Sequence, residues 1–121
     1  MRKHIQQRLA SGAKLADIKA DVMHTAIDAA LIACYGNQTK ASELLTMHRQ
    51  VMREWLNSET RDTYKRFEHV SLRVGTATIK ELLTEAYREA VDIVMAETQS
   101  QTETAKRLDC QRGTVRKYLK K

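Results

Sequence analysis

The feature that most constrains the fold of this chain is an internal repeat. Residues 36–56 read GNQTKASELLTMHRQVMREWL and residues 99–119 read QSQTETAKRLDCQRGTVRKYL. At a constant offset of 63, six positions are identical: Gln38, Thr39, Leu45, Arg49, Arg53 and Leu56 match Gln101, Thr102, Leu108, Arg112, Arg116 and Leu119. A repeat of this kind in a chain of 121 residues predicts two copies of one supersecondary unit.

The composition favours helix along the whole chain. Proline is absent and glycine occurs four times, and no segment alternates apolar and polar residues long enough to indicate a strand. A longer amphipathic stretch precedes each copy, over residues 15–33 and 79–95, with apolar residues at helical spacing. Gly36 is expected to end the first, and Thr78 and Glu81 form a capping box for the second. We therefore predict an all-α fold.

Each copy has the pattern of a helix-turn-helix. The expected helices span about residues 40–45 and 48–57 in the first copy and about 103–108 and 111–120 in the second. Thr39 and Thr102 are expected to cap the first helix of each copy, because a hydroxyl accepts from a free backbone N–H of the first turn. Met52 and Val115 are expected to face the core.

The remaining face of each second helix is polar and basic. It carries His48, Arg49, Gln50 and Arg53 in the first copy, and Gln111, Arg112, Thr114, Arg116 and Lys117 in the second. Such side chains contact phosphates and base edges when a helix lies in a major groove. The net charge is +6, and residues 101–121 carry seven basic side chains against two acidic ones, which favours a polyanionic partner. The competing interpretation is a solvated helix whose cations complement its dipole.

These residues resemble the C-terminal helix-turn-helix of the Fis-type DNA-binding proteins. The first copy matches through Gly36-Asn37-x-Thr39-x-Ala41 and the later Leu45 and Arg49, and QRGTVRKYLKK resembles the recognition helix of that family more closely. The resemblance covers about residues 36–57 and 99–121, and it implies dimeric binding of double-stranded DNA, often with bending. The DNA contacts that it implies fall on Asn37, Thr39, His48, Arg49 and Arg53, and on Thr102, Gln111, Arg112, Thr114, Arg116 and Lys117.

Several positions depart from that family. Glu54 stands where a basic residue is usual, and Val51 stands where the second copy keeps a hydroxyl at Thr114. We therefore expect the second copy to be the better reader of DNA. Trp55 and Tyr118, at equivalent positions, are expected to pack against a neighbouring helix, with stacking on a nucleotide as the alternative. Thr46 and Asp109 replace the usual turn glycine.

The sequence gives no support to an enzyme, a cofactor or a metal site. It contains no Gly-rich phosphate loop and no nucleophile elbow, and its four His lack metal-ligand spacing with either cysteine. Cys34 and Cys110 are expected to be reduced and buried. The apolar stretches are too short for a membrane span, and the first residues, MRKHIQQRLA, lack a signal-peptide hydrophobic region. We expect a cytoplasmic, nucleoid-associated protein.

The predicted architecture is two Fis-like helix-turn-helix units, each preceded by a longer amphipathic helix and joined by a helical linker. Residues 1–57 would hold an N-terminal arm, the first long helix and the first unit; residues 58–121 would hold a linker helix (about 59–72), the second long helix and the second unit. The two long stripes need each other or a second chain, which leaves a single-chain pseudo-twofold or an intertwined homodimer.

The predicted function is binding of double-stranded DNA, as a transcriptional regulator or a small architectural, DNA-bending factor of a bacterium or phage. The alternative is a protein-interaction module on the same scaffold, which would bind a transcription or anti-defence partner rather than DNA. The near-neutral first copy favours the alternative, whereas the strongly basic second copy opposes it.

Overall fold

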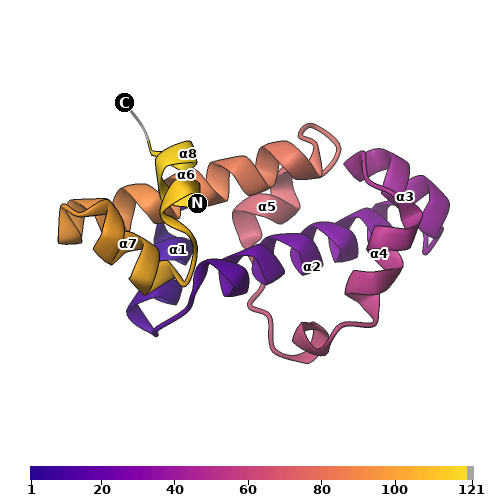
Figure 1. Cartoon of the computed structure of the whole chain (residues 1–121). Helices are drawn as coiled ribbons and strands as arrows, with labels where there is room; N and C mark the ends of the chain where they lie inside the picture. Colours follow the sequence, from indigo (N-terminus) through magenta and orange to yellow (C-terminus); the bar gives the residue numbers. More distant parts are fainter. Residues whose placement is uncertain (120–121) are drawn as a thin grey trace. The chain divides into compact units, whose positions relative to one another are not determined.

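The computed structural model describes residues 1–119, and this part of the chain is helical without any strand (Figure 1). The helices are α1 (Arg2–Ala10), α2 (Leu15–Ala33), α3 (Gln38–Leu45), α4 (Arg49–Leu56), the 3-10 helix η1 (Glu59–Asp62), α5 (Glu68–Arg73), α6 (Ile79–Thr98), α7 (Gln101–Leu108) and α8 (Arg112–Tyr118). The predicted all-α fold is confirmed. Lys120 and Lys121, which contribute to the basic C-terminal charge, lie outside the described residues.

The chain forms two compact units. The middle unit comprises residues 20–83, and the terminal unit comprises residues 1–19 together with residues 84–121. The middle unit holds the first copy of the repeat and the terminal unit holds the second. The division between residues 57 and 58, which follows the repeat in the sequence, stays a prediction.

The core of the middle unit is built from α2, of which residues 20–27 are all buried, and from residues of the later helices. Its largest fully buried apolar side chains are Val22 and Ile27 of α2, Leu45 of α3, Met52 of α4, Phe67, Val70 of α5 and Leu82 of α6. The apolar stripe expected over residues 15–33 ends as expected, because α2 stops at Ala33 and Gly36 follows with a φ of 82°. A positive φ is a conformation that glycine adopts without strain.

The connection between the copies differs from the prediction. A continuous helix over about residues 59–72 is wrong: the segment forms η1, then an extended stretch, then α5. The backbone N–H of Lys65 donates to Asp21 Oδ1, and that of Phe67 donates to Thr25 Oγ1, each at 2.9 Å. By accepting these backbone donors, the two buried side chains of α2 hold the segment in a non-helical path.

The first residues of the chain form a helix where an arm was expected. In α1, Ile5 and Leu9 are buried within the terminal unit. Arg2 donates to Glu89 at 2.8 Å and to Asp92 at 3.2 Å, and both acceptors lie on α6. The segment expected to be an N-terminal arm is therefore a helix within the packed structure of its unit.

The capping box that begins α6 is present. The backbone N–H of Glu81 donates to Thr78 Oγ1 at 3.1 Å, and the backbone N–H of Thr78 donates to Glu81 Oε1 at 2.9 Å. This reciprocal pair satisfies two backbone donors of the first turn and sets where the helix begins. The hydrogen bonds to Thr78 hold the pKa of the Glu81 carboxyl below its ordinary value, so the acceptor is ionised at neutral pH.

Candidate nucleic-acid interface

Helices α3 and α4 of the middle unit and α7 and α8 of the terminal unit share one backbone pattern. The first helices of the two pairs have eight residues each and begin and end at positions 63 apart. Thr46 and Asp109 follow them with φ values of 57° and 55°. The next amides, of Met47 and Cys110, each donate to the carbonyl five residues earlier at 3.0 Å. The repeat in the sequence is therefore also a repeat of turn geometry.

The residues that cap the first helices differ from the prediction. Asn37 Oδ1 accepts from the amide three residues on at 3.0 Å, and Ser100 Oγ does the same at 3.3 Å. Thr39 and Thr102 lie inside α3 and α7, so the capping role expected for them is wrong. Asn and Ser cap a helix at least as well as Thr, and each observed cap lies two residues before the expected one.

The inner side of each second helix is held by one fully buried residue, Met52 in α4 and Val115 in α8. Trp55 and Tyr118 are half-buried. Each contacts a ring of the long helix that precedes its own copy, His24 for Trp55 and Tyr87 for Tyr118. These contacts agree with the packing interpretation of the two aromatic residues.

In the middle unit the five residues predicted to contact DNA are exposed: Asn37, Thr39, His48, Arg49 and Arg53. Two of them are brought together, because Arg49 Nη1 donates to Thr39 Oγ1 at 3.1 Å. His48 occupies the N-cap position of α4, and its side chain makes no capping hydrogen bond there. The imidazole of His48 is thus available at the start of the helix.

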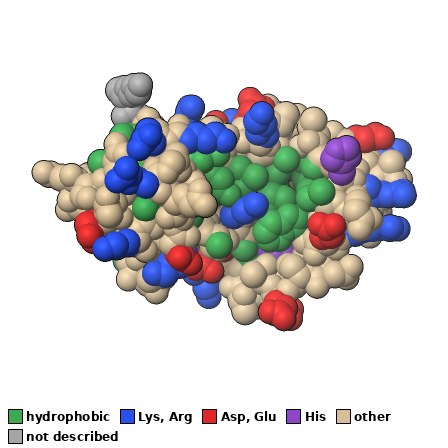
Figure 2. Space-filling view, viewed as in Figure 1, with side chains coloured by type: hydrophobic (Ala, Val, Ile, Leu, Met, Phe, Trp, Pro, Cys, Tyr) green, Lys and Arg blue, Asp and Glu red, His purple; other side chains and the backbone are tan. Residues whose placement is uncertain are grey.

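In the terminal unit, five of the predicted contacts are exposed and one is half-buried. The exposed residues are Thr102, Gln111, Arg112, Arg116 and Lys117, and Thr114 is half-buried. No acidic residue occurs in α8. Among residues 1–119, no carboxylate pairs with Arg112 or Arg116, whereas Arg107 of α7 pairs with Glu97. Figure 2 shows Lys and Arg side chains gathered over α7 and α8.

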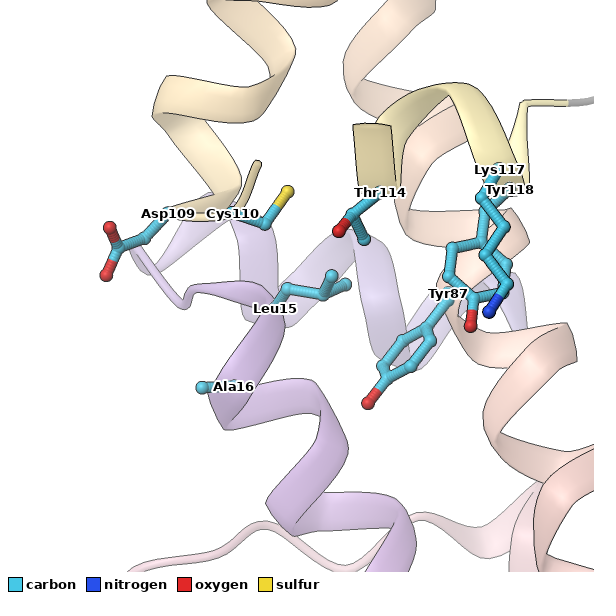
Figure 3. Close-up of a pocket in the computed structure, with 8 residues that line it drawn as sticks. All are labelled: Leu15, Ala16, Tyr87, Asp109, Cys110, Thr114, Lys117 and Tyr118. Carbon is cyan, nitrogen blue, oxygen red and sulfur yellow. The ribbon is translucent and has the colours of Figure 1, made fainter. Parts of the chain in front are cut away.

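A pocket of about 300 Å³ adjoins α8 within the terminal unit (Figure 3). Its walls include Leu15 of α2, Tyr87 of α6, Cys110 of the turn, and Thr114, Lys117 and Tyr118 of α8. Burial, together with the neighbouring Tyr118, raises the pKa of Tyr87 to about 12. The phenol of Tyr87 therefore remains a hydrogen-bond donor at physiological pH.

Lys117 lies both at the pocket and at the exposed surface of α8. Its side chain lines the pocket and also lies at the exposed surface of α8, with Nζ 5.3 Å from the centre of the Tyr118 ring. Such a cation–π contact holds a lysine over an aromatic ring without removing its charge. Thr114 likewise lines the pocket from the helix that carries the exposed cations.

Sequence reasoning missed a row of polar groups on α2. Asp21, His24 and Thr25 are buried and Asp28 is half-buried. His24 Nε2 lies 2.8 Å from Thr60 Oγ1, and burial and the nearby Arg61 lower the pKa of this imidazole, whereas Asp28 and Asp21 oppose the shift. The signal was present, because these four positions are spaced i, i+3, i+4 and i+7 and so share one helix face.

The described residues hold no group of three or more His, Cys, Asp or Glu arranged to bind a metal ion. Cys34 and Cys110 are free thiols, each half-buried. Within residues 1–119, no helix combines the length and the apolar character needed to cross a membrane.

Comparison of the chain with protein-family models, with curated protein sequences and with solved structures found no match.

Proposed function

We propose that the chain binds double-stranded DNA, with α8 as the principal recognition helix. The observation that carries the proposal is the exposed surface of α8. With the N-cap residue Gln111, it presents Arg112, Arg116 and Lys117 and includes no carboxylate. The buried Val115 packs the opposite side of the helix into the core of its unit. Arginine and glutamine side chains can contact both phosphates and base edges.

The turn before α8 supports the same function. Asp109 adopts the left-handed conformation, and α8 begins three residues later. Two short helices joined by such a turn, with a basic second helix, match the architecture of a helix-turn-helix reader. The resemblance to Fis-type proteins, strongest over residues 111–121, adds to this argument. The protein would act as a transcriptional regulator or a small DNA-bending factor, associated with the nucleoid of a bacterium or the genome of a phage.

The first copy of the repeat would contribute less to DNA affinity than the second. Its second helix, α4, carries Glu54 beside Arg53, and a carboxylate at that surface repels the phosphate backbone. Arg49 already donates to Thr39, so this guanidinium is positioned but partly engaged. We propose that α4 makes secondary contacts to DNA.

The experiment that tests the function is binding of a labelled duplex, followed by fluorescence anisotropy across a salt series. The paired variant Arg112→Ala plus Arg116→Ala should weaken binding and reduce the slope of log K against log salt by about 2, about 1 for each arginine that pairs with a phosphate. The pair Arg49→Ala plus Arg53→Ala should weaken binding less. The matched control is Lys65→Ala plus Arg66→Ala, which removes the same charge from exposed positions outside α4 and α8.

Two outcomes contradict the proposal. If the intact protein shows no salt-dependent binding to duplex DNA, DNA binding is wrong. If the control pair weakens binding as much as the α8 pair, binding reflects net charge alone rather than α8. Equal losses from the α4 and α8 pairs would contradict only the ranking of the two copies. Light scattering of the free protein would establish whether one chain or a homodimer binds.

One observation favours the alternative, binding to a protein partner. In the middle unit Ile32, Tyr35 and Leu72 expose 79%, 99% and 74% of their surface. Large exposed apolar side chains are more frequent where a protein surface is used for binding than elsewhere. Absence of salt-dependent duplex binding would make this second function the preferred one.

A further inference from the structure

We propose that the pocket beside α8 binds a small aromatic anion, and that its occupation weakens DNA binding. The first part stands on the geometry of the terminal unit alone. The second part rests on the function proposed above. The pocket is distinct from the exposed surface that would meet the duplex, although the two share Thr114 and Lys117.

The size and the walls of the pocket suit an aromatic ring. Its volume of about 300 Å³ lies at the lower end of the range for small-molecule sites, which suits a single-ring ligand. Tyr87 and Tyr118 meet edge-to-face at one wall, with ring centroids 5.2 Å apart and an interplanar angle of 69°. Leu15 contributes an apolar side chain that points into the same space (Figure 3). A planar apolar group would complete this aromatic cluster.

The polar atoms at the pocket select an anion. Lys117 supplies a cation, and the hydroxyls of Thr114 and Tyr87 can donate hydrogen bonds. Asp109 also borders the pocket, but Figure 3 shows its carboxylate turned away from the space that the tyrosines enclose. Burial and Asp109 raise the pKa of the Cys110 thiol, which therefore brings no negative charge. A carboxylate on an aromatic ring matches this set of donors.

The equivalent positions of the other copy have different chemistry. At the offset of 63, Glu54 replaces Lys117 and Val51 replaces Thr114. His24, the counterpart of Tyr87, is fully buried and bonded to Thr60. The donor set of the pocket is therefore specific to the second copy and is not a necessary product of the repeated helix pair.

Binding in the pocket would be coupled to DNA binding through two shared side chains. Thr114 and Lys117 are among the predicted DNA contacts. A ligand carboxylate that paired with Lys117 and accepted a hydrogen bond from Thr114 would neutralise the lysine charge and occupy the threonine hydroxyl. The coupling is reciprocal, so that a bound duplex would also weaken binding of the anion.

The first experiment measures ligand binding without DNA. The probe is 4-hydroxyphenylacetate, and its neutral counterpart is 4-hydroxyphenylacetamide. In amide NMR spectra of the full chain, the anion should cause saturable shifts at Cys110 and Thr114, with a dissociation constant of about 1 mM or tighter. The amide should bind at least about fivefold more weakly, because it lacks the charge that Lys117 would pair with. Absence of saturable shifts, or equal binding of the two probes, would overturn the proposed site.

A matched pair of variants locates the binding site. Ala16 borders the pocket and is exposed, so Ala16→Trp should place a bulky side chain at the edge of the pocket and hinder entry of the ligand, without disturbing a buried contact. Ala33→Trp makes the same change at an exposed position of α2 outside it. The first variant should lose the shifts caused by the anion, and the second should keep them. Loss in both, or retention in both, would contradict the assignment to this pocket.

The second experiment adds the duplex. At a probe concentration ten times its dissociation constant, mutually exclusive binding would reduce the affinity for DNA by about tenfold. The Ala16→Trp variant should bind DNA and ignore the probe. Unchanged DNA affinity of the wild type would disprove the coupling while leaving the ligand site intact. Failure of the wild type to bind DNA without the probe would instead disprove the proposed function.

Discussion

Trp55 meets His24 edge-on, with ring centroids 5.3 Å apart and ring planes at 88°. Sixty-three positions later, Tyr118 meets Tyr87 in the same way, at 5.2 Å and 69°. The letters of the repeat are recognisable only from residue 36 to 56 and from 99 to 119, yet this contact repeats between each second helix and the long helix before it. The structural repeat therefore extends into α2 and α6.

This contact leads to a prediction about stability. Trp55→Ala should reduce the free energy of unfolding by about 2 kcal/mol, less than for a fully buried aromatic because Trp55 is half-exposed. Glu54→Ala, at the exposed neighbouring position, should change it by no more than about 0.5 kcal/mol. Urea unfolding followed by circular dichroism measures both. Equal effects would show that Trp55 does not hold α4 to α2.

The buried imidazole of His24 predicts a dependence of stability on pH. Burial and Arg61 lower the pKa of His24 in the folded state, against the opposing effect of Asp28 and Asp21. The neutral form is therefore favoured by folding. Its contribution is fully present above the unfolded pKa of about 6.5, and is lost as the pH falls through the lower folded pKa.

The measurement is the free energy of unfolding at about pH 7.5 and about pH 5, across the titration range of histidine. The drop between the two should be smaller in His24→Gln than in the wild type. His48→Gln, at an exposed position, should keep the wild-type drop. An equal drop in all three proteins would mean that carboxylates alone cause the acid sensitivity.

The helix caps give a third prediction. Asn37→Ala and Ser100→Ala should each reduce the free energy of unfolding by about 1 kcal/mol, because each removes the acceptor of a first-turn amide. Thr39→Ala and Thr102→Ala should have smaller effects, since alanine has the higher helix propensity inside a helix. Thermal unfolding of the four variants checks the order. A larger loss from the threonine variants would restore the capping role expected from the sequence.

The turn between α3 and α4 leads to a fourth prediction, about backbone strain at Thr46. Thr46 is β-branched and has a φ of 57°, a conformation that costs such a residue on the order of 1 kcal/mol or more. Thr46→Gly should therefore raise the free energy of unfolding by roughly 0.5 kcal/mol, after allowing for the greater freedom of glycine in the unfolded chain.

The control for this substitution is Thr63→Gly, also at an exposed residue after a short helix but with a φ of −120°. It should lower the free energy of unfolding, because no strain is relieved there. The two variants are compared by urea unfolding under the same conditions. A loss of stability in both would show that the left-handed turn at Thr46 is not strained.

Much of the helical framework could be predicted because its signals are local. Apolar spacing located α2 from Leu15 to Ala33, and the Thr78 and Glu81 pair located the start of α6. Each signal depends on residues within one or two turns of the chain. The exposed residues of α8 were predictable for the same reason, because the buried Val115 fixes the opposite face.

The segment between the copies could not be predicted in this way. Its sequence around Tyr64 and Phe67 has apolar residues at helical spacing, but its backbone donors are taken by Asp21 and Thr25 of α2, more than forty residues earlier. A contact at such separation overrides local propensity. The pocket beside α8 could not be predicted for the same reason, because its lining residues Leu15 and Tyr118 are about a hundred positions apart in the sequence.

The order of the units along the chain has a consequence for synthesis. Residues 20–83 form an unbroken stretch, whereas the terminal unit needs residues 84–121 to complete it. A ribosome takes roughly 5 to 20 seconds to add the hundred or so residues that follow residue 19. During that interval Ile5 and Leu9 have no finished core to enter, while the middle unit can already assemble. During synthesis the middle unit would thus be complete first, and residues 1–19 would join their unit only after residues 84–121 follow.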